Sequence, residues 1–280
     1  MAMGGGYIID LDIRKYFDTI DHQHIQSIFR KRVRDGVLTR LIGKWLNAGV
    51  MEEDLITYLD SGVPQGGVVS PILSNIYLHE ALDGWFEDVA KPRLRGKAFM
   101  VRFADDAVLM FERLDDAERM MDVLPKRFAK YGLTLHPEKT RLVNFKKPTK
   151  EVEGPENSES FNFLGFTHYW AKSLNGYWVI KQKTAKDRLA RSLKRLSVWL
   201  RDVRHEPIAE QHKKLCSKVR GHTQYYGVRG NSKALSCFVD CAQKLWKKWL
   251  SRRSHRAKKQ WEWYNGIVER FPLPRPVIVH

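Results

Sequence analysis

Residues 99–111 read Phe-Met-Val-Arg-Phe-Ala-Asp-Asp-Ala-Val-Leu-Met-Phe, two short apolar runs on either side of Ala104-Asp105-Asp106. This pattern predicts a β-hairpin with an acidic tip. Adjacent carboxylates repel each other, so each needs water or a cation. Because Mg²⁺ prefers carboxylate oxygens, the tip is a candidate metal site. The alternative interpretation is an ordinary turn exposed to solvent.

A third carboxylate, Asp12, ends another apolar run that starts at Tyr7. If this run is a strand antiparallel to the hairpin, Asp12 lies opposite Asp105 and Asp106. Two Mg²⁺ ions about 3.5–4 Å apart could then activate a hydroxyl and stabilise a leaving phosphate, with Mn²⁺ as a substitute. The alternative role for Asp12 is a helix cap.

The remaining elements follow from apolar spacing and from cap and turn residues. Asp21 is expected to cap a helix, Ser70 to cap another with Pro71 as its first residue, and Pro125 to kink or split the helix over 115–131. Asn175-Gly176 predicts a hairpin turn, and Asn231-Ser232 predicts a helix cap. Strands are expected at 133–135, 141–145, 161–170 and 177–180, and helices at 37–46, 184–203, 207–226 and 232–252. This order predicts an α+β domain with an antiparallel sheet, over 7–170, followed by an all-helical domain over 171–280.

Charge is divided unevenly along the chain. Residues 1–170 contain 23 Lys+Arg and 25 Asp+Glu, a net charge of −2, whereas residues 171–280 contain 26 and 7, a net charge of +19. This asymmetry favours chemistry in the first part and nucleic-acid binding in the second. A membrane surface is the weaker candidate partner, because no stretch combines a clean apolar face with a lipidation signal. No apolar run reaches the ~18–20 residues of a membrane helix. Three cysteines do not form a disulfide framework, which favours a reduced intracellular compartment.

Five segments together resemble the palm motifs of reverse transcriptases, in the order of that family. They are Asp12-Ile13-Arg14-Lys15-Tyr16-Phe17-Asp18, Gly62-Val63-Pro64-Gln65-Gly66-Gly67, Phe103-Ala104-Asp105-Asp106, Leu135-His136-Pro137-Glu138-Lys139-Thr140 and Phe163-Leu164-Gly165-Phe166. The chain is most similar to the reverse transcriptase/maturase of bacterial group II introns. Its basic tail, with Tyr225-Tyr226-Gly227, resembles the thumb or maturase domain of that family.

The resemblance implies RNA-directed DNA synthesis with RNA as template, DNA as primer or target, and deoxynucleoside triphosphates as substrates. It implies Asp12, Asp105 and Asp106 as the catalytic metal ligands and Lys139 as a group that assists pyrophosphate departure. It implies Phe17 as a steric gate against a 2′-hydroxyl. Further implied roles are nucleotide binding by Ile13, Pro64, Gln65 and Gly66, and a primer grip at Phe163, Leu164 and Gly165.

The basic tail interleaves cations with aromatic side chains, a pattern suited to phosphates and exposed bases. The aromatic residues are Trp199, Tyr225, Tyr226, Trp246, Trp249, Trp261, Trp263 and Tyr264. The cations expected to contact phosphate are Lys247, Lys248, Arg252, Arg253, Arg256, Lys258 and Lys259. A zinc site at His212, Cys216, Cys237 and Cys241 is an alternative, although small buried cysteines explain these residues more simply.

The chain departs from the family pattern in two places. Phe103 stands where the family has Tyr, and the loss of one hydroxyl should be tolerated. No fingers region is expected ahead of Tyr7, which leaves other functions open unless a partner chain supplies the fingers. The alternatives are an RNA-binding splicing maturase, a truncated remnant without polymerase activity, and another palm enzyme such as an RNA polymerase or a nucleotide cyclase. The implied location is the bacterial cytoplasm, in association with the nucleoid or a ribonucleoprotein.

Overall fold

The computed structural model describes residues 5–46, 50–52, 55–57, 62, 69–148, 158–253 and 261–280. The chain divides into two compact units, residues 1–159 and 160–280. The boundary expected at residue 170 would instead fall inside strand β8 (Phe166–Lys172), which belongs with the second unit. Residues 160–170 carry no Lys, Arg, Asp or Glu, so the two units keep net charges of −2 and +19.

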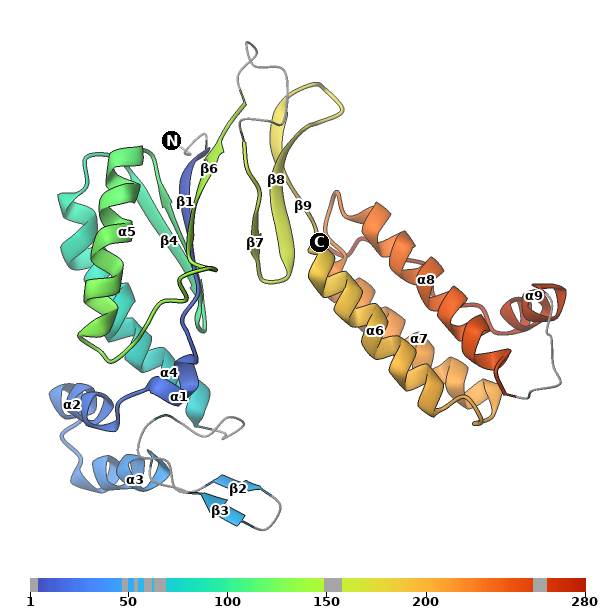
Figure 1. Ribbon diagram of the computed structural model, residues 1–280, viewed down its shortest axis with the longest axis horizontal. Helices are drawn as coiled ribbons and strands as arrows, with labels where there is room; N and C mark the ends of the chain where they lie inside the picture. The colour runs from blue at the N-terminus through green and yellow to red at the C-terminus, as the bar shows by residue number, and fades with distance from the viewer. Residues whose placement is uncertain are drawn as a thin grey trace. The chain divides into compact units, whose positions relative to one another are not determined.

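The first unit is built on a four-stranded antiparallel sheet of order β4-β5-β1-β6 (Figure 1). Its strands are β1 (Gly5–Leu11), β4 (Ala98–Phe103), β5 (Asp106–Phe111) and β6 (Arg141–Lys146). A separate two-stranded pair is formed by β2 (Val50–Glu52) and β3 (Leu55–Thr57). The predicted hairpin is therefore confirmed, and β1 lies between β5 and β6.

Helices cover one face of this sheet, and α5 packs along β1, β5 and β6 (Figure 1). Alternate strand residues such as Ile9, Leu11 and Leu109 point into the core beneath the helices. The helices are α1 (Tyr16–Thr19), α2 (His22–Arg32), α3 (Gly36–Leu46), α4 (Ser70–Leu78), the π-helical turns η1 (His79–Asp83) and η2 (Phe86–Ala90), the 3₁₀ turn η3 (Lys91–Arg93) and α5 (Leu114–Ala129).

Three local expectations for the first unit are wrong. Ser70 lies inside α4, with Val69 at the cap position. Helix α5 runs through Pro125 without a break, because its packing on three strands offsets the lost backbone hydrogen bond. Residues 133–135 form no strand, only a single bridge between Leu135 and Ile13. The Asp21 cap is confirmed, since its carboxylate accepts hydrogen bonds from the backbone of Gln23 and His24.

Gly62 occupies a position that only glycine fits, and its replacement gives a testable prediction. Its φ is +88°, and an added Cβ would lie 2.7 Å from the carbonyl oxygen of Phe17. We expect Gly62→Ala to lower the free energy of unfolding by about 1–3 kcal/mol in urea denaturation. Gly36→Ala is the matched control, because an added Cβ there meets nothing within 4 Å. Equal effects of the two substitutions would contradict the prediction.

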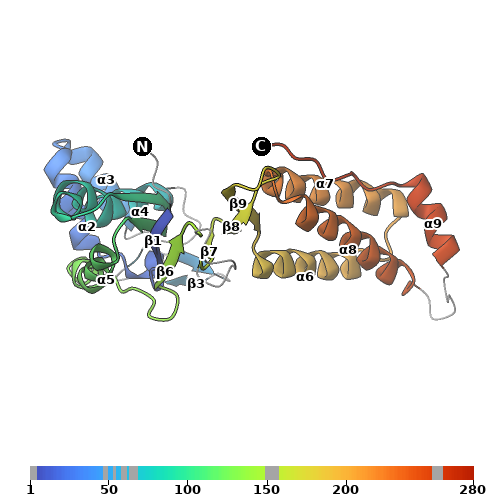
Figure 2. The ribbon, with the colours of Figure 1, turned by 90° about the horizontal axis from the view of Figure 1, so that it is seen from above.

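The second unit joins a three-stranded antiparallel sheet to a helical bundle (Figure 2). Its strands are β7 (Phe161–Phe163), β8 (Phe166–Lys172) and β9 (Trp178–Thr184). Its helices are α6 (Lys186–Asp202), α7 (Ile208–Tyr226), α8 (Ser232–Leu250) and α9 (Trp261–Arg270). Helix α8 packs against both α6 and α7. The α+β class is confirmed. The range 171–280 is not all-helical, because it contains the end of β8 and the whole of β9, and α9 was not expected.

Two expectations for the bundle need correction. Trp246 and Tyr264 are buried in its core, where they make an edge-to-face contact, so neither is available to stack on RNA bases. Asn231 does stand at the cap position of α8, but its side chain makes no cap hydrogen bond. Instead its amide binds the backbone N–H and hydroxyl of Thr184 and the carbonyl of Tyr226, which ties β9 to the α7–α8 turn.

His222 makes the stability of this bundle dependent on pH. Burial against Phe238 and Tyr226 lowers the pKa of His222 from 6.5 to about 4. Its buried Nε2 has no hydrogen-bond partner among the described residues. Protonation therefore favours the unfolded chain, so the stability that neutral His222 contributes is fully present above about pH 6.5 and is lost as the pH falls toward 4.

We expect His222→Phe, which keeps the ring stacking, to reduce the slope of unfolding free energy against pH between 4 and 6.5. The slope that one histidine contributes is at most about 1.4 kcal/mol per pH unit. Urea denaturation at several pH values measures it. Exposed His205 provides the control, since His205→Phe should leave the slope unchanged. A His222→Phe variant with the wild-type slope would contradict this assignment.

Candidate active site

The ends of β1 and β5 bring the predicted carboxylates to neighbouring positions. The register pairs Leu11 with Ala107, so the next positions along the two strands are Asp12 and Asp106. Directly opposed residues of an antiparallel pair share a face. Asp12 and Asp106 therefore lie on the face opposite the helices, and Asp105 lies beside them in the turn that joins β4 to β5.

The segment that follows α5 holds Asp12 from both its backbone and its side chain. The hydroxyl of Thr140 accepts a hydrogen bond from the Asp12 N–H and donates one to its carbonyl, at 3.3 and 3.2 Å. The backbone N–H of His136 donates to the same carbonyl. Lys139 Nζ lies 3.3 and 3.4 Å from the two carboxylate oxygens of Asp12. Lys139 thus contacts the carboxylate of Asp12 directly. Thr140 positions the backbone of Asp12, a role that sequence reasoning missed.

Asp10 is a fourth carboxylate on the same face, two residues before Asp12. It lies 3.6 Å from Arg141 on β6. Burial raises the pKa of Asp10 to about 6, and although Arg141 opposes this rise, the charges of Asp106 and Asp12 add to it. Strand alternation places Asp10 and Asp12 on one face, so the sequence contained this signal.

The carboxylates suit a divalent cation in the kind of donor they offer. Asp12, Asp105 and Asp106 supply the oxygen ligands that Mg²⁺ prefers, and Asp12 has a cation, Lys139, beside it. The structure does not bring three such ligands into one metal-binding group, because no set of three His, Cys, Asp or Glu side chains in the described ranges could hold a metal ion. The three aspartates therefore fit a divalent cation in the chemistry of their donor atoms and in their positions at neighbouring strand ends.

The residues expected to contact the nucleotide lie partly inside the described structure. Ile13 is buried and bridges to Leu135. Phe17 lies in α1, partly buried against the first core and tilted against Tyr16, with ring centroids 5.3 Å apart. Its backbone contacts Gly62, the first residue of the glycine-rich segment 62–67. Pro64, Gln65 and Gly66 fall outside the described residues.

The predicted primer-grip residues form the tight turn between β7 and β8. Leu164 and Gly165 both have positive φ, the pattern of a type I′ turn. Two tyrosines at the end of α7 contact this turn. Tyr225 donates a hydrogen bond to the Leu164 carbonyl, and the Tyr226 hydroxyl lies 2.9 Å from the position that a Cβ on Gly165 would take. Phe163 pairs with Phe166, which contacts both tyrosine rings.

The basic cluster at the end of α8 contains cations with different environments. Lys248 and Arg252 are exposed and lie against the ring of Trp249. Arg253 instead donates to the carbonyls of Arg204 and Glu206 and so fixes the α6–α7 connection. Lys247 is half-buried on α8. Arg256, Lys258 and Lys259 fall outside the described residues.

The alternative zinc site is not formed in the described part of the chain. His212 Nε2 lies 3.1 Å from Cys216 Sγ and 2.9 Å from the Pro272 carbonyl oxygen. Cys237 and Cys241 neighbour each other one turn apart on α8. No described set of three potential ligands could hold a metal ion, so these side chains are best explained by packing.

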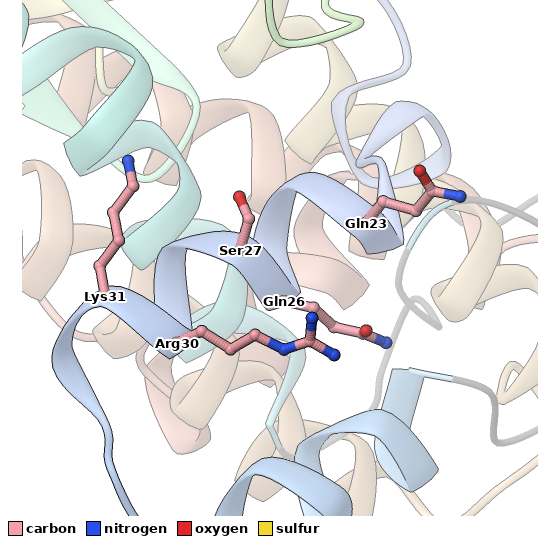
Figure 3. A pocket seen from close by; sticks show the side chains of 5 residues that line it. All are labelled: Gln23, Gln26, Ser27, Arg30 and Lys31. Atoms are coloured by element: carbon pink, nitrogen blue, oxygen red, sulfur yellow. The ribbon is translucent and has the colours of Figure 1, made fainter.

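A polar hollow of about 460 Å³ lies along α2 (Figure 3). Gln26 and Arg30 extend on one side of this helix, and Lys31 points away from them. The hollow is lined by Gln23, Gln26, Ser27, Arg30 and Lys31. It contains none of the residues that the sequence singled out. Among the described helices, none is both long and apolar enough to cross a membrane.

Comparison with known families agrees with this geometry. Residues 3–168 match the family described as "Reverse transcriptase (RNA-dependent DNA polymerase)". The match covers more than half of the chain and includes β1, the β4–β5 hairpin and the segment around Lys139. The chain therefore belongs to the reverse transcriptase family.

Individual relatives come from introns and retroelements. The chain is 40% identical to group II intron-encoded protein LtrA of Lactococcus lactis over 28% of its own length and 13% of LtrA. It is 34% identical to protein YkfC of Escherichia coli over 38% of this chain and 34% of YkfC. It is 24% identical to the Pol polyprotein of retrotransposable element R2 from Popillia japonica, over 89% of this chain and 42% of that protein. The chain thus spans less than half the length of each.

A solved structure shares the fold. Apo telomerase from Candida tropicalis superposes with a TM-score of 0.51 over 94% of this chain and 45% of that chain, at 13% sequence identity. This likeness concerns the fold alone.

Proposed function

We propose that this chain carries the catalytic centre of an RNA-directed DNA polymerase of the group II intron type, which extends a DNA primer along an RNA template with deoxynucleoside triphosphates. The observation that carries the proposal is the placement of Asp12 and the Asp105-Asp106 turn at neighbouring strand ends, with Lys139 beside Asp12. Membership of the reverse transcriptase family supports it.

Asp12, Asp105 and Asp106 would hold two Mg²⁺ ions, with Mn²⁺ as a substitute. When bound, such ions lower the pKa of a primer hydroxyl and neutralise charge on a leaving phosphate. The chain's own residues would supply the rest. Thr140 hydrogen-bonds the backbone of Asp12, and Lys139, which lies beside the Asp12 carboxylate, would assist the departure of pyrophosphate as a cation or a proton donor. Phe17 would exclude a 2′-hydroxyl, and the turn at Leu164 and Gly165 would position the primer strand.

Primer extension tests this proposal. The full chain is given an RNA template, a DNA primer, deoxynucleoside triphosphates and Mg²⁺, next to an Asp105→Ala/Asp106→Ala variant. We expect extension by the wild type and none by the variant. The polymerase proposal is falsified if the wild type extends no primer while it still binds RNA.

A second candidate function, RNA binding as a splicing maturase, rests on the charge of the second unit. Its 26 Lys+Arg against 7 Asp+Glu suit the phosphates of a folded intron RNA. Group II intron RNA and an unrelated RNA of equal length are compared in filter binding between 50 and 200 mM salt. A maturase role requires tighter binding of the intron RNA, whereas equal, salt-sensitive binding of both would contradict it.

A further inference from the structure

Arg102, the second-last residue of β4, points to the side of the sheet that the helices cover. The strand alternates exposed Phe99, Val101 and Phe103 with covered residues, and Arg102 belongs to the covered set. Only 12% of its side chain is exposed. An arginine in such a place needs partners, because an unpaired buried charge is strongly destabilising.

The guanidinium group of Arg102 has four hydrogen bonds to three different elements. Nε and Nη2 form a bidentate pair with the carboxylate of Asp83, at 2.7 and 2.6 Å. Nη1 donates to the side-chain oxygen of Asn75 at 2.9 Å and to the carbonyl of Ala104 at 2.7 Å. Arg102 thus joins α4 and η1 to the turn that precedes Asp105.

The turn that Arg102 holds has a strained backbone. Ala104 has a φ of +53°, in the left-handed region that alanine avoids. Such a conformation persists only when surrounding contacts fix it. The hydrogen bond from Arg102 to the Ala104 carbonyl is one such contact, and Ala104 immediately precedes Asp105.

We propose that Arg102, held by Asp83 and Asn75, is the positioning residue that keeps the Ala104-Asp105-Asp106 turn in the conformation that presents both aspartates. The proposal rests on the proposed polymerase function for its consequence in catalysis. Its structural part, the fixing of the turn, is measurable without any activity.

Four variants of the full chain separate positioning from general stability. Arg102→Gln removes the ion pair and the contact with Ala104, and Arg102→Gln/Asp83→Asn does so without an unpaired carboxylate. Arg102→Lys keeps a cation beside Asp83, but a single ammonium group cannot reproduce the planar fork that serves all three partners. Arg127→Gln is the matched control. Arg127, on α5, donates hydrogen bonds to the carbonyls of Glu80 and Ala81 in η1, the turn that also contains Asp83, but it does not contact the Ala104 turn.

Three quantities are measured in each variant: hydrogen exchange of a peptide that spans residues 103–107, Mn²⁺ affinity by electron paramagnetic resonance, and steady-state primer extension. In Arg102→Gln and in the double variant we expect hydrogen exchange of the 103–107 peptide to be about tenfold faster, because the loss of one hydrogen bond makes local opening of the turn easier by about that factor. We also expect weaker Mn²⁺ binding and a lower kcat with an unchanged KM for the template–primer. Arg102→Lys should have a melting temperature close to that of the wild type, but hydrogen exchange of its 103–107 peptide should remain faster than in the wild type.

The results distinguish the possible roles. The proposal would be overturned if the 103–107 peptide exchanged at the wild-type rate in Arg102→Lys and in the double variant. It would also be overturned if Arg127→Gln accelerated the exchange of this peptide as much as the Arg102 variants do. If the wild type neither binds Mn²⁺ nor extends a primer, the polymerase proposal fails, while the exchange of the tip peptide still decides whether Arg102 fixes the turn.

Discussion

Asp12→Asn is expected to lower the rate of nucleotide addition by about three orders of magnitude or more, because the substitution removes the negative charge of a metal ligand. The change is nearly isosteric, and the contacts of Thr140 are to the backbone of Asp12, so the strand should keep its place. Single-turnover primer extension with saturating Mg²⁺ measures the rate. RNA binding should be retained, since the net positive charge of the chain lies in residues 160–280.

Asp122→Asn is the control for this experiment. Asp122 is an exposed carboxylate on α5, in the same unit but away from the strand ends, and the same change of charge there should leave the rate unaltered. A rate for Asp12→Asn within tenfold of the wild type would exclude Asp12 as an essential ligand. Retained RNA binding by a variant inactive in synthesis would show that the two functions are separable.

Phe17→Val is expected to lower the discrimination between deoxyribonucleotides and ribonucleotides by about a hundredfold, because a smaller side chain leaves room for a 2′-hydroxyl. The ring of Phe17 is partly buried and its backbone contacts Gly62, which lies three residues before Gln65 in the sequence. The ratio of kcat/KM for dTTP and UTP on an adenine template measures the discrimination. Addition of dTTP itself should change little.

Phe29→Val controls for the loss of packing. Phe29 on α2 is likewise partly buried against the first core, so its truncation removes similar apolar contact without altering the region near Gly62. Selectivity should remain at the wild-type value in this variant. Equal loss of discrimination in both variants would mean that Phe17 acts through stability and does not act as a gate.

The sequence predicted the elements whose signal is local. Two apolar runs on either side of an acidic turn predicted the β4–β5 hairpin, and the run from Tyr7 predicted β1 beside it. The Asp21 cap was predicted because a helix start needs a side-chain acceptor at that one position. For the candidate site, antiparallel pairing alone was enough to place Asp12 near the hairpin tip.

Features that depend on distant partners were not predictable in the same way. Asn231 has the residue type and position of a cap, yet its amide serves Thr184 and Tyr226, and only the folded chain reveals those partners. The contacts of Thr140 with Asp12 join residues 128 positions apart. Arg102 did leave a signal, a charge on the covered side of an apolar strand, but its partners in α4 and η1 could not be inferred from spacing.

The π-helical turn η1 determines on which side of its helix Asp83 lies relative to Asn75, the two side chains that bind Arg102. In a regular α-helix two residues eight positions apart, such as Asn75 and Asp83, differ by about 80° around the axis. A π turn accommodates one additional residue, which returns both side chains to the same side, where they share one guanidinium group. Deletion of one residue between them would rotate Asp83 by about 100° and leave the three aspartates unchanged in sequence. If Arg102 positions the turn as proposed, a relative with an alignment gap in this helix should lose polymerase activity even where it keeps all three aspartates.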